Sequence, residues 1–108
     1  MQSLPIVPRL MTDVRTGAKR HTIRWQERTI SPGLMRYVST EDPNSTATVR
    51  VSAVVTMPLS SVACYLGKSD EWPDAVLLEG RREHYPDIQL DSRVEVIHHS
   101  APLPNAEK

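Results

Sequence analysis

The stretch "RTGAKRHTIRW", residues 15–25, holds the pattern on which both the fold and the candidate site depend. It gathers four Lys/Arg side chains and a histidine, although the whole chain balances 13 basic residues against 13 acidic ones. A surface that binds an anion must therefore come from a local arrangement of cations and not from overall basicity. Gly17 follows a helix-like pattern over residues 8–16, and glycine at that position is a typical helix stop.

Residues 21–25 predict a β-strand that directly follows the basic cluster. Side chains alternate between the two faces of a strand, so Ile23 and Trp25 share one face. Thr22 and Arg24 then share the other face. The alternation predicts an apolar face that packs and a polar face that is open to a ligand.

The glycine decides where Lys19 points. In a straight strand Lys19 would face away from Thr22 and Arg24, but a turn across residues 17–20 would bring it to their side. An ammonium, a hydroxyl and a guanidinium would then converge, which suits an anionic or carbonyl-bearing ligand. The alternative is a solvated basic strand edge that discourages aggregation of sheets. Spacing alone favours this alternative.

Length and composition indicate one small soluble domain. The chain has 108 residues and no phenylalanine, so aliphatic residues, two tryptophans and three tyrosines must fill the core. The single Cys64 excludes an internal disulfide and a cysteine-based zinc site. No signal peptide and no apolar run of about 20 residues is present, so we expect a cytoplasmic protein that does not associate with a membrane.

The remaining pattern predicts an α+β domain of several strands and short helices. The apolar residues Ala75, Val76 and Leu78, with Leu77 as a further candidate, are expected to face inward from a helix that begins near Pro73. The strands at 34–39 and 48–57 should pair as a hairpin. We expect strands near residues 4–7, 21–25, 34–39, 48–57 and 93–99, and helices near 8–16, within 58–66 and from 73 onward.

The order of these motifs resembles the ASCH domain family, whose fold is a small PUA-like β-barrel with short flanking helices. The family signature Gly-x-Lys-x-x-Thr-x-Arg is matched by Gly17, Lys19, Thr22 and Arg24. A "PG" turn, a hairpin, a helix, "YP" and a terminal "VEVI" strand follow in the family's order. The resemblance covers about residues 4–98, which implies an ASCH-like domain over 1–100 and a flexible tail over 101–108.

The resemblance implies a cleft that binds RNA or a modified nucleoside, without a cofactor, a metal or an obligate protein partner. Some members of the family are amidohydrolases that act on 4-acetylcytidine with a lysine, a threonine and a glutamate, and others are ribonucleases. The first two carry over to Lys19 and Thr22. The glutamate falls on Asp70 or Glu71, of which Glu71 has the matching identity.

Further side chains are candidates for contacts with the ligand. Trp72 could stack a base, whereas Trp25 is expected to pack in the core. Tyr85 could line the cleft or pack. His98 and His99 are adjacent on a strand and point to opposite faces, so we expect no metal site there. The candidate ligand-binding residues are Lys19, Arg20, Arg24, Asp70, Trp72 and Tyr85.

Two hypotheses follow, a binding module and a hydrolase. As a base toward Thr22, Lys19 would have to be neutral, which requires its pKa to fall by roughly three units from about 10.4. Desolvation and the charge of Arg24 would lower that pKa, and Glu71 would raise it. The hydrolase therefore needs a partly buried Lys19 within reach of Thr22. An exposed Lys19 would leave ligand binding alone.

Overall fold

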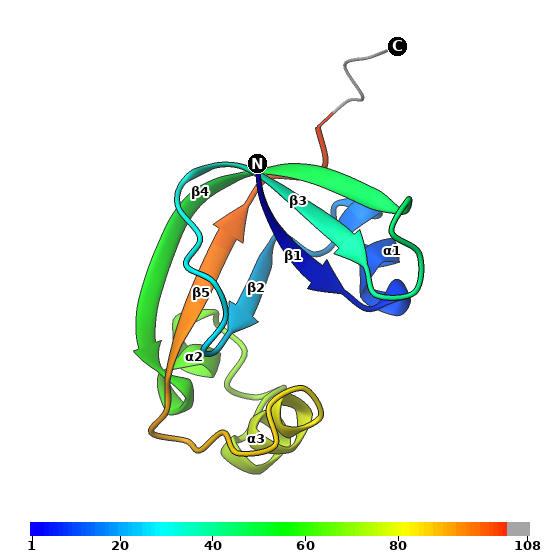
Figure 1. The fold of residues 1–108 in the computed structure, drawn as a ribbon. Helices are drawn as coiled ribbons and strands as arrows, with labels where there is room; N and C mark the ends of the chain where they lie inside the picture. Colours follow the sequence, from blue (N-terminus) through cyan, green and yellow to red (C-terminus); the bar gives the residue numbers. More distant parts are fainter. Residues whose placement is uncertain (104–108) are drawn as a thin grey trace. The chain divides into compact units, whose positions relative to one another are not determined.

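A computed structural model describes residues 1–103, and it has the predicted α+β architecture (Figure 1). Five strands form one mixed sheet with the hydrogen-bonding order β1-β3-β4-β5-β2, so β1 and β2 are its edge strands. Three short helices accompany the sheet. The elements are β1 (Gln2–Ile6), α1 (Pro8–Thr16), β2 (His21–Arg24), β3 (Gly33–Ser39), β4 (Thr46–Pro58), α2 (Leu59–Tyr65), α3 (Asp74–Arg82) and β5 (Arg93–His99).

The described residues divide into two compact units, each with a hydrophobic core of its own. The first unit comprises residues 1–22, 29–54 and 97–103, and the second unit comprises residues 23–28 and 55–96. No buried hydrophobic residue of one core belongs to the other. The few apolar residues of the chain are therefore divided between two small clusters.

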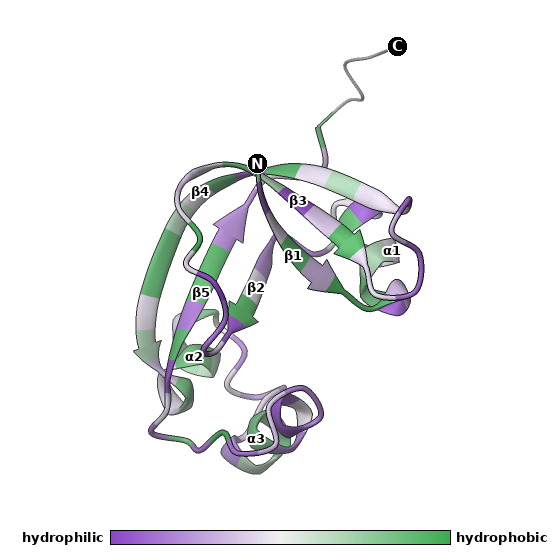
Figure 2. Cartoon of the chain, viewed as in Figure 1, coloured by the Kyte–Doolittle hydropathy of each residue, from purple (hydrophilic) through white to green (hydrophobic). Residues whose placement is uncertain are grey.

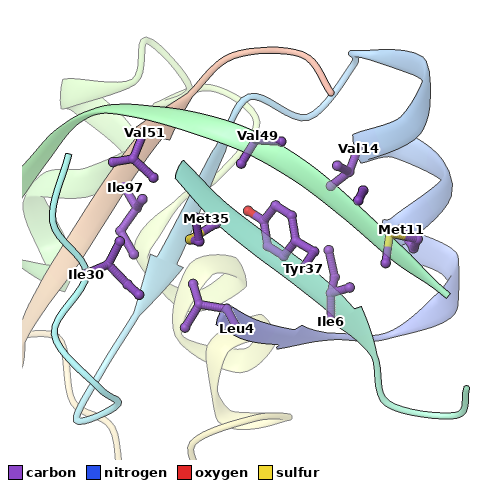
Figure 3. Packing of buried hydrophobic residues seen from close by; sticks show 11 residues of the cluster. Leu4, Ile6, Met11, Val14, Ile30, Met35, Tyr37, Val49, Val51 and Ile97 are labelled. Atoms are coloured by element: carbon purple, nitrogen blue, oxygen red, sulfur yellow. The ribbon is translucent and has the colours of Figure 1, made fainter. Parts of the chain in front are cut away.

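In the first unit, β3 joins its two neighbours in different ways. It pairs with β4 as the antiparallel hairpin that the sequence predicts, with Met35 opposite Val49. It also pairs in parallel with β1, which places Leu4 beside Tyr37. Figure 3 shows the Tyr37 ring enclosed by aliphatic and methionine side chains. The buried members of this core are Leu4, Ile6, Met11, Val14, Ile30, Met35, Tyr37, Ala47, Val49, Val51 and Ile97.

Helix α1 begins and ends where the sequence predicts. Pro8 occupies the first helical turn, where its missing N–H costs nothing, and Met11 and Val14 bury one face. Gly17 caps the other end in the left-handed conformation, with φ 82°. A residue with a Cβ is strained in that conformation by about 1–2 kcal/mol, so glycine is required there by geometry.

A polar pair lies inside the first core. The His99 side chain is buried, with its Nδ1 2.7 Å from the Ser100 carbonyl oxygen and its Nε2 2.9 Å from the Tyr37 hydroxyl. A carbonyl only accepts, so Nδ1 carries the proton and Nε2 accepts from the Tyr37 O–H. Burial lowers the pKa of His99, the Ser100 carbonyl raises it, and the charges of Lys19 and His98 lower it, with a net downward shift.

This shift predicts a stability that depends on pH. Below its ordinary pKa of 6.5 the unfolded His99 takes up a proton that the folded one refuses, so unfolding is favoured as the pH falls through that window. We expect the free energy of unfolding to decrease from pH 7 to pH 5, measured by urea denaturation. In His99→Gln this component should be lost, and an unchanged pH profile in the variant would contradict the assignment.

The second unit contains α2, α3 and one end of the sheet, and β5 begins with alternating polar and apolar residues (Figure 2). Helix α3 buries Leu77 and half-buries Leu78, but Ala75 and Val76 are exposed. Their predicted inward orientation is wrong, because consecutive helical residues are about 100° apart and a run of four cannot share one face. The core consists of Ile23, Met57, Leu59, Val62, Ala63, Leu77, Ile88, Val94 and Val96.

Candidate functional site

The chain turns at Gly17 as the sequence predicts. The Gly17 amide donates to the Val14 carbonyl oxygen at 3.1 Å, and the Lys19 amide donates to Asp13 at 3.0 Å. The Arg20 Nε then reaches back to the Gly17 carbonyl oxygen at 3.0 Å. The basic cluster is therefore a closed turn, held by two main-chain hydrogen bonds and one from the Arg20 side chain, that connects α1 to β2.

The two predicted chemical residues on this turn and its strand differ in exposure. Lys19 is half-buried. Burial is the largest cause of the lowered pKa of His99, the hydrogen bond to the Ser100 carbonyl opposes it, and the charge of Lys19 lowers the pKa further. Thr22 is only 4% exposed. Among residues 1–103 no buried side-chain nitrogen or oxygen lacks a hydrogen-bond partner. The expected open polar face of β2 is therefore covered at Thr22, since alternation sets the face of a side chain and not what lies over it.

Charge is distributed unequally between the two units. The described part of the first unit has six Lys/Arg residues against three Asp/Glu residues, so its net charge is positive. The second unit has six Lys/Arg residues against nine Asp/Glu residues and is negative. The neutral net charge of the chain thus conceals two units of opposite net charge. The cations of the first unit are Arg9, Arg15, Lys19, Arg20, Arg36 and Arg50.

In the second unit, Arg24 and Tyr85 both contact Glu27. The Arg24 Nη1 lies 3.4 Å from Glu27 Oε1, with the two side chains 12% and 23% exposed. The Tyr85 hydroxyl donates to Glu27 Oε2. Burial first, and then the hydrogen bond to the Glu27 carboxylate, raise the pKa of Tyr85 to about 12. The phenol therefore stays protonated and remains a donor at neutral pH.

Glu27 and Tyr85 border a hollow of about 260 Å³. The Trp25 and Tyr85 rings meet edge to face, with centroids 6.1 Å apart and planes at 86°. His84 approaches Tyr85 in a similar way at 6.4 Å. The hollow is lined by Trp25, Gln26, Glu27, His84, Tyr85, Pro86 and Asp87, all of the second unit.

The predicted carboxylates lie in the turn that precedes α3. Glu71 is exposed, and its carboxylate lies 3.7 Å from the Lys68 amine in a surface ion pair. Asp70 is also exposed. Trp72 is half-buried and packs against the second core, with its amide bonded to the Lys68 carbonyl oxygen at 2.8 Å. A role for these three residues stays a prediction.

Comparison with known proteins identifies the fold. Neither a family model nor a curated protein matches the sequence. Two crystal structures of ZmASCH from Zymomonas mobilis, a serine-to-alanine and a tyrosine-to-phenylalanine mutant protein, superimpose with a TM-score of 0.67. The chain has the ASCH fold. The superpositions cover 94% and 93% of this chain and 70% of the ZmASCH chains, at 10% sequence identity.

Within this ASCH fold, the predicted site residues fall into three groups. Lys19, Arg20 and Thr22 belong to the glycine turn and the start of β2 in the first unit. Arg24 and Tyr85 share Glu27 in the second unit. The remaining three, Asp70, Glu71 and Trp72, form the turn before α3.

Sequence reasoning missed Glu27, which lines the hollow. Glu27 lies three residues beyond the signature arginine, and the Tyr85 hydroxyl that contacts it is 58 residues away in the sequence. The one available signal was the "WQE" at 25–27, a carboxylate next to an aromatic residue directly after a strand.

Two further observations concern the described residues only. None of the three helices within residues 1–103 has the length and apolar character needed to cross a bilayer. No group of three or more His, Cys, Asp or Glu side chains in that range is arranged to hold a metal ion. The adjacent His98 and His99 differ in exposure, the first half-buried and the second buried.

Proposed function

We propose that the chain is a binding module for RNA or a modified nucleoside, with the cations around the glycine turn as its phosphate contacts. The observation that carries the proposal is the positive charge of the first unit, concentrated where the family signature begins. The resemblance to ASCH domains supplies the class of ligand. A local excess of lysine and arginine supplies the attraction that the neutral chain as a whole lacks.

The turn offers cations with two different geometries. Arg20 is exposed, and its Nε is fixed to the Gly17 carbonyl oxygen, which leaves the terminal nitrogens of its planar fork for a phosphate. Lys19 is half-buried and acts as a point charge.

A hydrolase remains the second candidate, and one observation favours it. Lys19 is half-buried, as a base with a lowered pKa requires. Thr22, however, is 4% exposed, while a nucleophile must approach its carbonyl to about 3–3.5 Å. Glu71 is exposed beside Lys68. The binding module therefore agrees with more of the site than the hydrolase does.

The proposal predicts binding that weakens steeply with salt. With two or three phosphates neutralised, the Kd for a short single-stranded RNA should rise about 7- to 20-fold from 50 to 200 mM salt. Fluorescence anisotropy of a labelled oligonucleotide measures this. Arg20→Ala should weaken binding and lower the logarithmic salt slope by about 0.7. The matched control is Lys68→Ala, whose lysine lies in the second unit with its side chain 38% exposed and ion-paired with Glu71.

Equal losses in both variants, or binding that is insensitive to salt, would contradict the assignment of the phosphate contacts. The same mixtures, and a parallel incubation with 4-acetylcytidine, are then separated by chromatography. Product formed by the wild-type protein and abolished in Thr22→Ala would replace the binding module with the hydrolase.

A further inference from the structure

The hollow of the second unit has a chemistry that the phosphate contacts do not explain. Its walls are aromatic, and its rim carries Glu27, a carboxylate with two assigned donors. We propose that this hollow holds the Watson–Crick edge of a guanine base, with Glu27 as the acceptor for its two N–H groups. This inference rests on the proposed function, since it names the base that the RNA or nucleoside presents.

Glu27 keeps accepting capacity after its own contacts are counted. An ionised carboxylate offers about four lone-pair sites on two oxygens. Arg24 occupies one site on Oε1 and the Tyr85 hydroxyl occupies one on Oε2. Two sites remain, one on each oxygen, which is the arrangement that two parallel N–H donors require.

The two protein donors also hold the carboxylate in one orientation. The Tyr85 phenol is a donor at neutral pH, and Arg24 is a permanent one. The lone pairs that remain on Glu27 can only accept, so a ligand edge that bonds to this carboxylate must supply donors.

This condition selects among the bases. Guanine presents N1–H and an N2 amino group side by side, so both bond to one carboxylate. Adenine and cytosine place a ring nitrogen acceptor next to their amino group, and uracil places its N–H between two carbonyls. An acceptor of the base would then oppose a carboxylate oxygen, and two acceptors form no hydrogen bond.

The aromatic residues set how a base lies. Trp25 and Tyr85 touch edge to face at 6.1 Å, so no ring can be inserted between them. A base instead lies against one open ring face, as in single-strand recognition. The volume of about 260 Å³ is slightly below the roughly 300–1,000 Å³ of ligand pockets, which suits one base better than a whole nucleotide.

The backbone around the hollow also supports a ligand-binding role. Gln26 has φ 55°, the one positive φ outside glycine among residues 1–103. For a residue with a Cβ this conformation costs about 1–2 kcal/mol. It lies between Trp25 and Glu27, two residues that line the hollow, and such strain is typical of ligand-binding segments.

A methylated ammonium is the rival occupant, because aromatic rings and the carboxylates of Glu27 and Asp87 attract cations. The charge of Arg24, which lies 3.4 Å from Glu27, opposes it. A neutral base meets no such repulsion. The observations therefore favour guanine over a cation.

The test compares mononucleotides on the full chain by isothermal titration calorimetry. We expect guanosine monophosphate to bind about 5- to 150-fold more tightly than inosine monophosphate, which lacks only the N2 amino group. Adenosine and cytidine monophosphates should bind no more tightly than the inosine nucleotide, which keeps one of the two donors. Glu27→Gln should abolish the preference, because its amide presents a donor beside a single acceptor. Glu79→Gln, an exposed acid on α3, is the matched control.

Tyr85→Phe provides a second variant that keeps the ring and removes one donor to Glu27. It should reduce the guanine preference while the folded far-UV circular dichroism spectrum is retained. Arg20→Ala, in contrast, should leave the guanine preference intact, because Arg20 does not line the hollow.

The outcomes separate the two proposals. Salt-dependent RNA binding without a guanine preference overturns this inference and leaves the proposed function in place. A preference that survives Glu27→Gln also overturns it. Tighter binding of tetramethylammonium than of guanosine monophosphate assigns the hollow to a cation, and binding of neither RNA nor any nucleotide overturns both proposals.

Discussion

Replacing Tyr37 with alanine is expected to lower the free energy of unfolding by about 3–5 kcal/mol, as for other large aromatic residues truncated in a core. Tyr37 is 0% exposed in the first unit. Figure 3 shows it between Met35, Val49 and Ile6, so its removal leaves a cavity that rigid strands cannot close. Natural domains have about 5–15 kcal/mol in total, and this single change would remove a third or more of a typical value.

Tyr37→Phe is the control that separates the ring from the hydroxyl. The ring and its packing remain, but His99 Nε2 loses the donor at 2.9 Å and stays buried. An unsatisfied buried acceptor costs about 1–3 kcal/mol. Urea denaturation at pH 7 should therefore rank the proteins as wild type, Tyr37→Phe and Tyr37→Ala in decreasing stability. A phenylalanine variant as stable as the wild type would mean that the hydrogen bond contributes nothing.

The corresponding change in the second unit is Ile88→Ala, for which we expect a loss of about 2–5 kcal/mol. Ile88 is 0% exposed. Its amide donates to the Tyr85 carbonyl oxygen at 3.0 Å, and its own carbonyl accepts from Arg82 Nε at 3.0 Å. The backbone at this position cannot move freely to fill the cavity. The segment that carries Tyr85 to the hollow should lose order together with the side chain.

Tryptophan fluorescence suits this measurement, because Trp25 and Trp72 both belong to the second unit. The matched control is Val76→Ala, an apolar truncation on a side chain that is 51% exposed, and its effect should stay within about 0.5 kcal/mol. If the two variants were equally destabilised, the burial of Ile88 would not explain its contribution to the free energy of unfolding.

Local chemistry was sufficient to predict most elements of the fold. Pro8 and Gly17 mark the two ends of α1, because one fits a first helical turn and the other tolerates a positive φ. The β-branched run at 48–57 lies within β4, and the alternating residues 93–99 form β5. The parallel pairing of β1 with β3 was not predicted, since it joins residues about 33 apart that no turn connects.

The candidate site was predictable only where it is local. The turn at Gly17 follows from one residue, whereas the contact between Glu27 and Tyr85 joins positions 58 apart. No periodicity encodes that contact. The domain limits also stay a prediction: the Leu103 amide bonds to the Thr48 carbonyl oxygen at 2.8 Å, and residues 104–108 of the expected tail lie outside the described residues.

The segregation of charge has a consequence for handling the protein in solution. The chain carries no net charge near its pI of about 6.9, so no long-range repulsion keeps copies apart at neutral pH. The positive unit of one molecule then attracts the negative unit of another, most strongly in dilute buffer, where the Debye length is long. Solubility should therefore increase when salt is first added, in the same range of ionic strength that weakens nucleic-acid binding.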